Sequence, residues 1–343
     1  MQKNKRILIF NVNWLGDVLF STATIRNIRF NYPESYIACI IPGRCYSVLK
    51  GNPYIDEVII FDEKDRHRSI FSKINFIRQL RYKKFDMAVL LHGSLTRALI
   101  CKLSNIPEII GYDTKNRGIF LTKRIPPPLR DSMHRIDYYL NIAEKGGFRL
   151  EDRFLDFFTK EEDDDFARDF LKKNNCSESD FVVGINPGGN WLPKRWPKQY
   201  WALLADKMIR NLDAKVIITG SQSDLPLIKE ITGWMKEKPI IAAGAMNIKQ
   251  FAALCKCLGL FISADTGPLH IANSVGTKKI IALFGPTHVA ITGPYPLKHA
   301  VILQKKVGCR LPCYIVDCKD NRCMKGITPE EVFDQVKTIK EQQ

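Results

Sequence analysis

Short apolar runs alternate with amphipathic segments along most of the chain. Strand-length runs in the first half occupy residues 6–12, 36–42, 56–61, 87–93 and 106–112. Helical patterns separate them, beginning with one that follows Gly16, continues through Ile28 and must stop at Pro33. Strands that alternate with helices predict a parallel sheet with helices on both faces.

The same alternation begins again in the second half. The apolar runs there are residues 182–188, 215–220, 240–243, 258–264 and 278–285, and we expect the last of them to be the final strand. The fold class that we predict is therefore α/β, with two Rossmann-like doubly wound domains. Neither half carries G-x-G-x-x-G after its first strand, and the P-loop motif is absent from the sequence. Both observations argue against a dinucleotide oxidoreductase or a P-loop NTPase.

A charged and polar stretch over residues 159–180 separates the two series. Thr159 followed by Glu162 predicts a capping box that opens a helix within this stretch, and Thr328 with Glu331 predicts a second one near the end of the chain. The division that we expect is an N-terminal domain over 1–165, a C-terminal domain over 166–327 and a C-terminal helix over 328–343.

Length and charge narrow the class of protein. The chain has 343 residues, enough for about two domains, and a net charge of +16. The first 150 residues carry +12 of this charge, which fits nucleic acid, an anionic membrane surface or a phosphorylated substrate. No run approaches a membrane span of about 20 apolar residues, and the N-terminus lacks a signal-peptide core. We therefore expect a cytoplasmic protein.

The segment SADTGPLHIANSVG, residues 263–276, places a strand end, a turn and a helix start in succession. Asp265, Thr266 and Gly267 form the turn, and His270 falls in the first helical turn. Backbone N–H groups at a helix N-terminus suit a diphosphate. The same pattern also fits an ordinary βα turn with an Asp that caps the helix.

A second loop, INPGGNWLPKRWP, combines two glycines with a cation after a strand. A glycine-rich turn beside Lys194 can hold a phosphate and neutralise a leaving group, although a solvated basic loop has the same composition. In the first half, Asp17 follows Gly16 at a helix start, where the helix dipole favours the ionised carboxylate. Such a group can act as a general base toward an alcohol or simply cap the helix.

Together these segments resemble glycosyltransferase family 9, the ADP-heptose:lipopolysaccharide heptosyltransferases. The resemblance rests on NWLGDVLFSTATIRNIR near the start, INPGGNWLPKRWP in the middle and SADTGPLHIANSVGTKKIIALFGPTHVAITGPY near the end. It implies a GT-B fold whose C-terminal helix packs back toward the first domain. It also implies inverting transfer of L-glycero-D-manno-heptose from ADP-heptose to the inner core of lipopolysaccharide, onto Kdo or the first heptose.

The resemblance also assigns roles to residues. Asp17 falls on the catalytic base, and Lys194 falls on the lysine that stabilises departing ADP. The positions expected to bind the nucleotide sugar are Gly188, Gly189, Asn190, Asp224, Asp265, Thr266, Gly267 and His270. Asp224 is the weakest of these assignments. Family members of this type need no metal, so we expect no cofactor beyond the donor substrate.

The implied acceptor is phosphorylated and held in the inner leaflet, so we expect peripheral association with the cytoplasmic face of the inner membrane. Arg97, Lys115 and Arg117 are candidates for binding this lipid A–Kdo type acceptor, and the alternatives for His92 are a contact with the acceptor or a packed or solvated side chain. Residues 64–84 mix cations with apolar side chains. They predict either an interfacial amphipathic helix or a core-facing helix with a solvated basic side.

Four cysteines, Cys309, Cys313, Cys318 and Cys323, lie within fifteen residues. Four thiols can bind zinc, but these spacings lack the paired C-x2-C knuckles of zinc sites. Free thiols or local disulfides are the alternatives.

Two other functions compete with the heptosyltransferase. One is a family 9 enzyme with a different donor or acceptor in cell-surface glycan synthesis. The other, suggested only by the net charge, is a nucleic-acid-binding protein, for which the sequence offers no RRM, KH or helix-turn-helix pattern; we expect no nucleic-acid partner.

Overall fold

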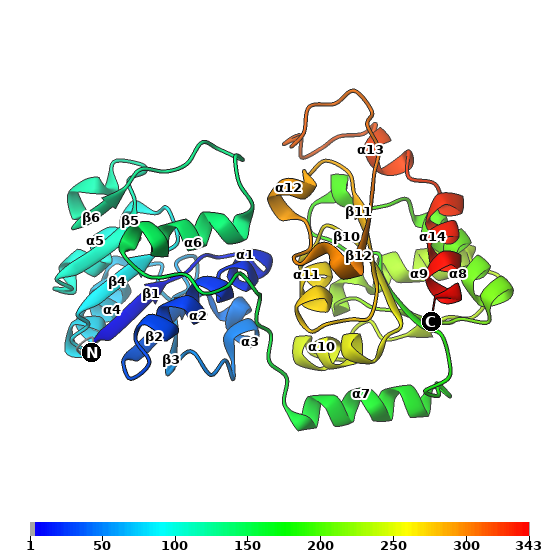
Figure 1. The fold of residues 1–343 in the computed structure, drawn as a ribbon, viewed down its shortest axis with the longest axis horizontal. Coiled ribbons are helices and arrows are strands. Elements are labelled where there is room, and N and C mark those ends of the chain that lie inside the picture. Colours follow the sequence, from blue (N-terminus) through cyan, green and yellow to red (C-terminus); the bar gives the residue numbers. More distant parts are fainter. Residues whose placement is uncertain (1–3, 343) are drawn as a thin grey trace. The chain divides into compact units, whose positions relative to one another are not determined.

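Buried apolar runs form two parallel sheets of six strands each. The computed structural model describes residues 4–342, which divide into a first unit ending at Phe158 and a second beginning at Thr159 (Figure 1). The division falls a few residues before the expected boundary at 165/166. The predicted α/β class and its two series of strands are confirmed, because every strand pair in both sheets is parallel.

The first sheet has the order β3-β2-β1-β4-β5-β6. Its strands are β1 (Arg6–Phe10), β2 (Tyr36–Ile41), β3 (Glu57–Ile60), β4 (Met87–Leu90), β5 (Glu108–Tyr112) and β6 (Lys123–Ile125). Its helices are α1 (Leu15–Phe20), α2 (Thr22–Asn31), α3 (Tyr46–Leu49), α4 (Ile70–Tyr82), α5 (Leu95–Leu103) and α6 (Arg135–Gly146). The direction of winding changes between β1 and β4, and the loops after these two strands are where a doubly wound sheet binds ligands.

The second sheet has the order β12-β11-β10-β7-β8-β9. Its strands are β7 (Val182–Asn186), β8 (Lys215–Ile218), β9 (Ile240–Ile241), β10 (Leu260–Ala264), β11 (Ile280–Phe284) and β12 (Ala300–Gln304). Its helices are α7 (Glu161–Lys173), α8 (Lys198–Leu212), α9 (Leu225–Trp234), α10 (Ile248–Cys257), α11 (Gly267–Ser274), α12 (Val289–Thr292), α13 (Arg322–Lys325) and α14 (Pro329–Glu341). Winding changes between β7 and β10, the strands that precede both glycine-containing loops.

Several local predictions were wrong. The run ending at Gly285 is not the last strand, because β12 follows and pairs with β11. The helix expected from Gly16 to Ile28 is two helices that meet at Ser21. The N-cap of α7 is Lys160 instead of Thr159, because the Asp163 carboxylate accepts from the backbone N–H of Lys160. Acidic residues crowd the first turn of α7, so a capping carboxylate was available in the neighbouring register.

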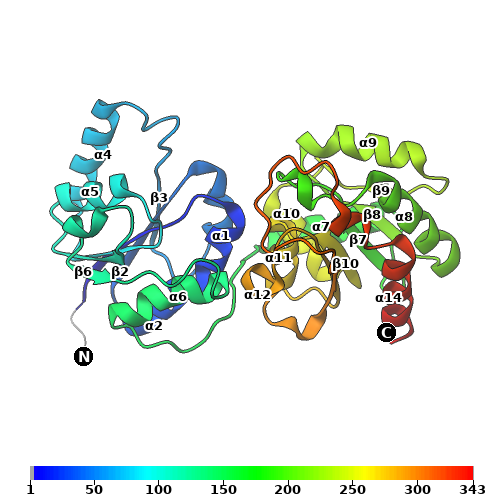
Figure 2. The ribbon, with the colours of Figure 1, turned by 90° about the horizontal axis from the view of Figure 1, so that it is seen from above.

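The C-terminal helix α14 packs on α8 within the second unit (Figure 2). Thr328 caps it as predicted, accepting from the backbone N–H of Glu331 at 3.2 Å. Val332, Val336 and Ile339 are buried in the core of the second unit. Its apolar face is therefore used within that unit, and the packing toward the first unit that the resemblance implied stays a prediction.

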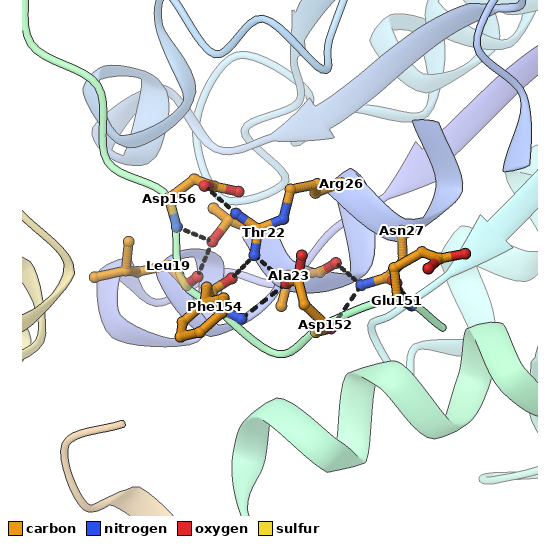
Figure 3. Close-up of polar contacts among 9 residues, drawn as sticks. All are labelled: Leu19, Thr22, Ala23, Arg26, Asn27, Glu151, Asp152, Phe154 and Asp156. Atoms are coloured by element: carbon orange, nitrogen blue, oxygen red, sulfur yellow. Dashed lines mark hydrogen bonds and ion pairs between the residues drawn. The ribbon is translucent and has the colours of Figure 1, made fainter. Parts of the chain in front are cut away.

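The segment by which the chain leaves the first unit is fixed to α2 by a buried polar network (Figure 3). Arg26, only 7% exposed, donates to Asp152 Oδ1, to Asp156 Oδ1 at 2.5 Å and to the backbone oxygen of Phe154 at 2.6 Å. Thr22 Oγ1 accepts from the backbone N–H of Asp156 at 2.9 Å. One arginine thus holds three points of an otherwise irregular segment, which gives the first unit a defined end.

No helix within residues 4–342 combines the length and the apolar character that crossing a bilayer requires.

Candidate active site

In the second unit, the loops after β7, β8 and β10 bring several of the predicted residues into contact. A Cβ atom added to Gly188 would lie 2.6 Å from Asp224 Oδ1, and one added to Gly189 would lie 3.1 Å from Thr266 Cγ2. These two glycines are therefore required for the close approach of the three loops. Asn190, which follows them, is exposed.

Lys194 and Asp265 form the charged centre of this site. Lys194 Nζ lies 2.7 Å from Asp265 Oδ2 and 2.9 Å from the backbone oxygen of Asp265. The side chain of Asp265 is 3% exposed and that of Lys194 is 18% exposed. The ammonium of Lys194 therefore lies at the edge of the site, and the buried carboxylate of Asp265 fixes its position.

Two further residues hold that carboxylate. His270 Nε2 lies 3.2 Å from Asp265 Oδ1, and Thr292 Oγ1 donates to Oδ2 at 2.9 Å. Burial opposes ionisation of Asp265, but the hydrogen bond from His270 and the charge of Lys194 outweigh it and hold the pKa of this carboxyl well below its usual range. His270 is itself 3% exposed. The structure therefore places His270 against Asp265, and the phosphate contact expected of it stays a prediction.

The N-terminus of α11 adds backbone donors to the site. Thr266 is the N-cap residue, but its side chain makes no capping hydrogen bond; its Oγ1 lies 3.2 Å from Ser263 Oγ. The first-turn N–H groups are therefore not capped by that hydroxyl, and Gly267 leaves them open to close approach. An uncapped helix N-terminus near a fixed ammonium is a combination suited to a diphosphate.

Asp224 has a local structural role in addition to its place at the site. Its Oδ2 accepts from the backbone N–H of Ser221 at 2.8 Å and from Ser221 Oγ at 2.6 Å. This capping box closes the turn that leads into α9. The side chain stays partly exposed and lies beside Gly188, and its predicted contact with the nucleotide sugar remains a prediction.

In the first unit, Asp17 lies on α1, in the loop region after β1. Tyr139 on α6 donates its hydroxyl proton to Asp17 Oδ1 at 2.9 Å. Tyr139 is 4% exposed. Burial and the neighbouring Asp17 carboxylate raise the pKa of Tyr139 well above its usual value, so the phenol remains a donor. The sequence offered no signal for this contact, since the two residues lie 122 positions apart.

The three candidates for acceptor binding differ in their exposure. Arg97 is 2% exposed and donates to Asn11 O and to Asn13 Oδ1, whereas Arg117 is fully buried and donates to Tyr112 O and His92 O. Both guanidinium groups brace the loops of the sheet from inside, so the expectation that they present charge to an acceptor is corrected. Lys115, in a left-handed turn, is exposed.

His92 lies among these cations. Burial, followed by the charges of Arg97, Lys115 and Arg117, lowers its pKa to about 3. The imidazole is therefore neutral at physiological pH, and its Nε2 lies 3.4 Å from Asn13 Nδ2. It serves the packing of the loops after β1 and β4.

The four clustered cysteines are free thiols. Cys313 donates its backbone N–H to Pro286 O at 2.7 Å, and the Cys318 thiol accepts from the backbone N–H of Asn321 at 3.4 Å. Within residues 4–342, no group of three or more His, Cys, Asp or Glu side chains is placed to hold a metal ion. Cys309, Cys313 and Cys318 lie in the loop between β12 and α13, and Cys323 lies on α13.

Two doubly wound units, each with a six-stranded parallel sheet, are the architecture of a GT-B glycosyltransferase. The chain belongs to glycosyltransferase family 9 (heptosyltransferase), whose family model matches residues 74–317.

Individual relatives agree with this assignment. The lipooligosaccharide heptosyltransferase 2 of Haemophilus ducreyi is 24% identical over 97% of this chain and 99% of its own length. The structure of the glycosyl transferase family 9 protein from Veillonella parvula has a TM-score of 0.88 and 27% identity, covering 100% of this chain and 99% of that one. Escherichia coli heptosyltransferase WaaC, solved with ADP, has the same fold, with a TM-score of 0.72, 15% identity and coverage of 97% and 99%.

Proposed function

We propose that this enzyme transfers L-glycero-D-manno-heptose from ADP-heptose to an inner-core sugar of lipopolysaccharide, with inversion at the anomeric carbon. The observation that carries the proposal is the Lys194–Asp265 pair beside the uncapped N-terminus of α11. Support also comes from the relatives, which are named as heptosyltransferases of lipooligosaccharide or lipopolysaccharide.

The donor's diphosphate suits the site in the second unit. Lys194 is partly exposed, and Asp265 holds its ammonium in one place without neutralising the backbone N–H groups of α11 nearby. As the bond between the anomeric carbon and the phosphate oxygen breaks, negative charge grows on the departing ADP. A fixed ammonium and oriented N–H groups stabilise that charge without reorganising. On this proposal the reaction requires no metal cofactor.

The acceptor's hydroxyl is activated by Asp17. The carboxylate takes the hydroxyl proton while the oxygen attacks the anomeric carbon, and ADP leaves from the opposite side in the same displacement. One displacement inverts the configuration of the sugar. A carboxylate suits this task because the helix dipole and the hydrogen bond from Tyr139 both favour its ionised form.

The acceptor in this proposal is a Kdo- or heptosyl-Kdo-substituted lipid A at the cytoplasmic face of the inner membrane. The net charge of +12 over the first 150 residues suits a phosphorylated glycolipid at an anionic surface. Lys115 is the exposed cation among the three residues first considered for acceptor binding.

The test is an acceptor assay that follows ADP release and product mass. The purified enzyme is given ADP-heptose with Kdo2-lipid A or, in parallel, with heptosyl-Kdo2-lipid A. We expect turnover with one of the two acceptors and loss of about a thousandfold in Asp17→Asn. A panel of other nucleotide sugars is the control. Turnover only with a different donor or acceptor would replace the proposal by another family 9 activity.

A further inference from the structure

Helix α4 exposes large apolar side chains on the face turned away from the core. Ile70 is 69% exposed, Phe71 80% and Ile74 41%. Phe76 and Leu80, on the opposite face of the helix, are buried in the core of the first unit. The helix is therefore anchored through one face, and Ile70 and Phe71 lie mostly outside the core.

These three exposed residues, Ile70, Phe71 and Ile74, form an apolar stripe on the first turns of the helix. Arg78 and then Tyr82 follow on the same side of the helix toward its C-terminal end. Tyr82, at the C-terminal end, is 89% exposed. Figure 2 shows α4 at the margin of the first unit. An exposed apolar stripe with a tyrosine at the far end of the helix is the pattern of a helix that lies in a membrane interface.

Cations surround the stripe. Residues 64–84 contain eight Lys and Arg side chains and one carboxylate, Asp65. Near the C-terminal end of α4, a hollow of about 890 Å³ is lined by Arg6, Arg78, Gln79, Tyr82, Lys83 and Lys84. Every charged group in that lining is a cation, although Lys83 also pairs with Glu57 at 2.7 Å. The surroundings of the stripe therefore complement a negatively charged partner.

We propose that α4 docks the first unit on an anionic phospholipid bilayer. Ile70, Phe71 and Ile74 enter the interface between headgroups and acyl chains, and the flanking cations bind headgroup phosphates. The inference rests on the proposed function in one respect: a lipid-anchored acceptor gives the enzyme a reason to bind a bilayer. The charge selects a bilayer over a second copy of this chain, whose own α4 would carry the same positive charge.

The test uses the full chain and sedimentation with sucrose-loaded vesicles that contain no acceptor. Vesicles of phosphatidylcholine mixed with phosphatidylglycerol are compared with vesicles of phosphatidylcholine alone. We expect binding to the anionic vesicles that weakens as salt is added. The variant I70S/F71S/I74S should bind at least about tenfold more weakly, and R66Q/R68Q should lose part of the preference for the anionic vesicles.

The matched control is L203S/W234S, which removes two exposed apolar side chains of the second unit, 50% and 62% exposed. It should bind as the wild type does. All variants should melt at the wild-type temperature, because the substituted side chains are exposed.

Wild-type binding by I70S/F71S/I74S, or equal binding to both vesicle types, would overturn the proposal. So would gel filtration in which that variant breaks up a wild-type oligomer, because the stripe would then be a protein interface. Turnover of a detergent-dispersed acceptor is measured separately. Turnover without vesicle binding refutes the docking alone, and vesicle binding without turnover refutes the proposed function alone.

Discussion

The switch points of the two sheets have the same topology but opposite chemistry. In the second unit, Lys194, His270 and Thr292 all converge on one buried carboxylate, Asp265. In the first unit, the carboxylate of Asp17 lies on an opening helix and is only partly buried. The same strand–loop–helix geometry thus presents positive charge and N–H groups in one place and a basic oxygen in the other. On the proposed function, the second unit would stabilise the leaving group and the first unit would accept the proton.

The largest expected effect comes from removing the proton acceptor. Asp17→Asn keeps the shape of the side chain and its contact with Tyr139 but cannot take a proton. We expect kcat to fall about a thousandfold, or roughly 4 kcal/mol in the barrier. ADP binding, measured by calorimetry, should be unchanged because the donor site belongs to the second unit. An equal loss of ADP affinity would show that the two sites do not divide the work in this way.

The corresponding change in the second unit should affect both binding and stability. Lys194→Met removes the cation and leaves Asp265 buried without its ion-pair partner. We expect weaker ADP binding, kcat lower by about a hundredfold and a loss of roughly 3 kcal/mol in the free energy of unfolding.

The double variant Lys194→Met/Asp265→Asn separates these effects. It should recover much of the stability, because no unpaired charge remains buried, but none of the ADP affinity. Recovery of both, measured by thermal melts and calorimetry, would mean that Lys194 acts only through folding.

Lowering the pH should change the free energy of unfolding of the two units in opposite directions. Burial raises the pKa of Asp156 to about 6, despite the nearby charge of Arg26, and its Oδ2 is buried without a hydrogen-bond partner (Figure 3). Because the folded pKa lies above the unfolded value of 3.8, protonated Asp156 stabilises the folded first unit. This contribution to the free energy of unfolding is fully present below pH 3.8 and is lost as the pH rises through 6. Asp265 has a lowered pKa, so its contribution is present above 3.8 and is lost in stronger acid.

Amide hydrogen exchange between pH 7 and pH 4 can follow each unit separately. From Asp156, we expect the first unit to gain up to roughly 3 kcal/mol as the pH falls, with Asp156→Asn as the control that removes this gain. The contribution of Asp265 should hold steady over the same range. A loss of protection in the first unit that Asp156→Asn abolishes would contradict the assigned direction.

The sequence predicted the elements that short-range signals define and missed those that tertiary contacts define. Thr328 predicts the start of its helix because capping is a local interaction. The edge strand β12 has the short apolar run AVILQ, but its pairing with β11, a tertiary contact, is what identifies it as a strand. In the site, the glycine loops and Lys194 are visible as motifs. Thr292, 27 positions from Asp265, lies within the last matching segment, but nothing in that segment predicts its contact with Asp265.

Charge was the least reliable guide to individual residues. Arg97 and Arg117 are part of the positive charge of the first unit. The sequence pattern cannot distinguish a solvated guanidinium group from one that donates hydrogen bonds to backbone oxygens in the interior. The structure shows the second case for both. In contrast, the cations near α4 are mostly exposed. The exposure of a cation, which only the fold determines, decides whether it meets a ligand.

The smallest expected effect comes from removing the hydroxyl group of Tyr139 that contacts Asp17. Tyr139→Phe removes one hydroxyl that donates to Asp17 Oδ1 at 2.9 Å and keeps the buried ring. The bond stabilises the ionised carboxylate, so its loss should raise the pKa of Asp17 and move the acid limb of the kcat/KM profile to higher pH. We expect about a tenfold fall in kcat near that limb, equivalent to about 1 kcal/mol, with little change in KM for the donor.

The buried thiol of Cys45, whose pKa burial raises to about 11, stays neutral across this range and does not add a second titration. A lower kcat with an unmoved pH profile would mean that Tyr139 only packs against α1, and the support of the base would then have to come from other contacts of Asp17.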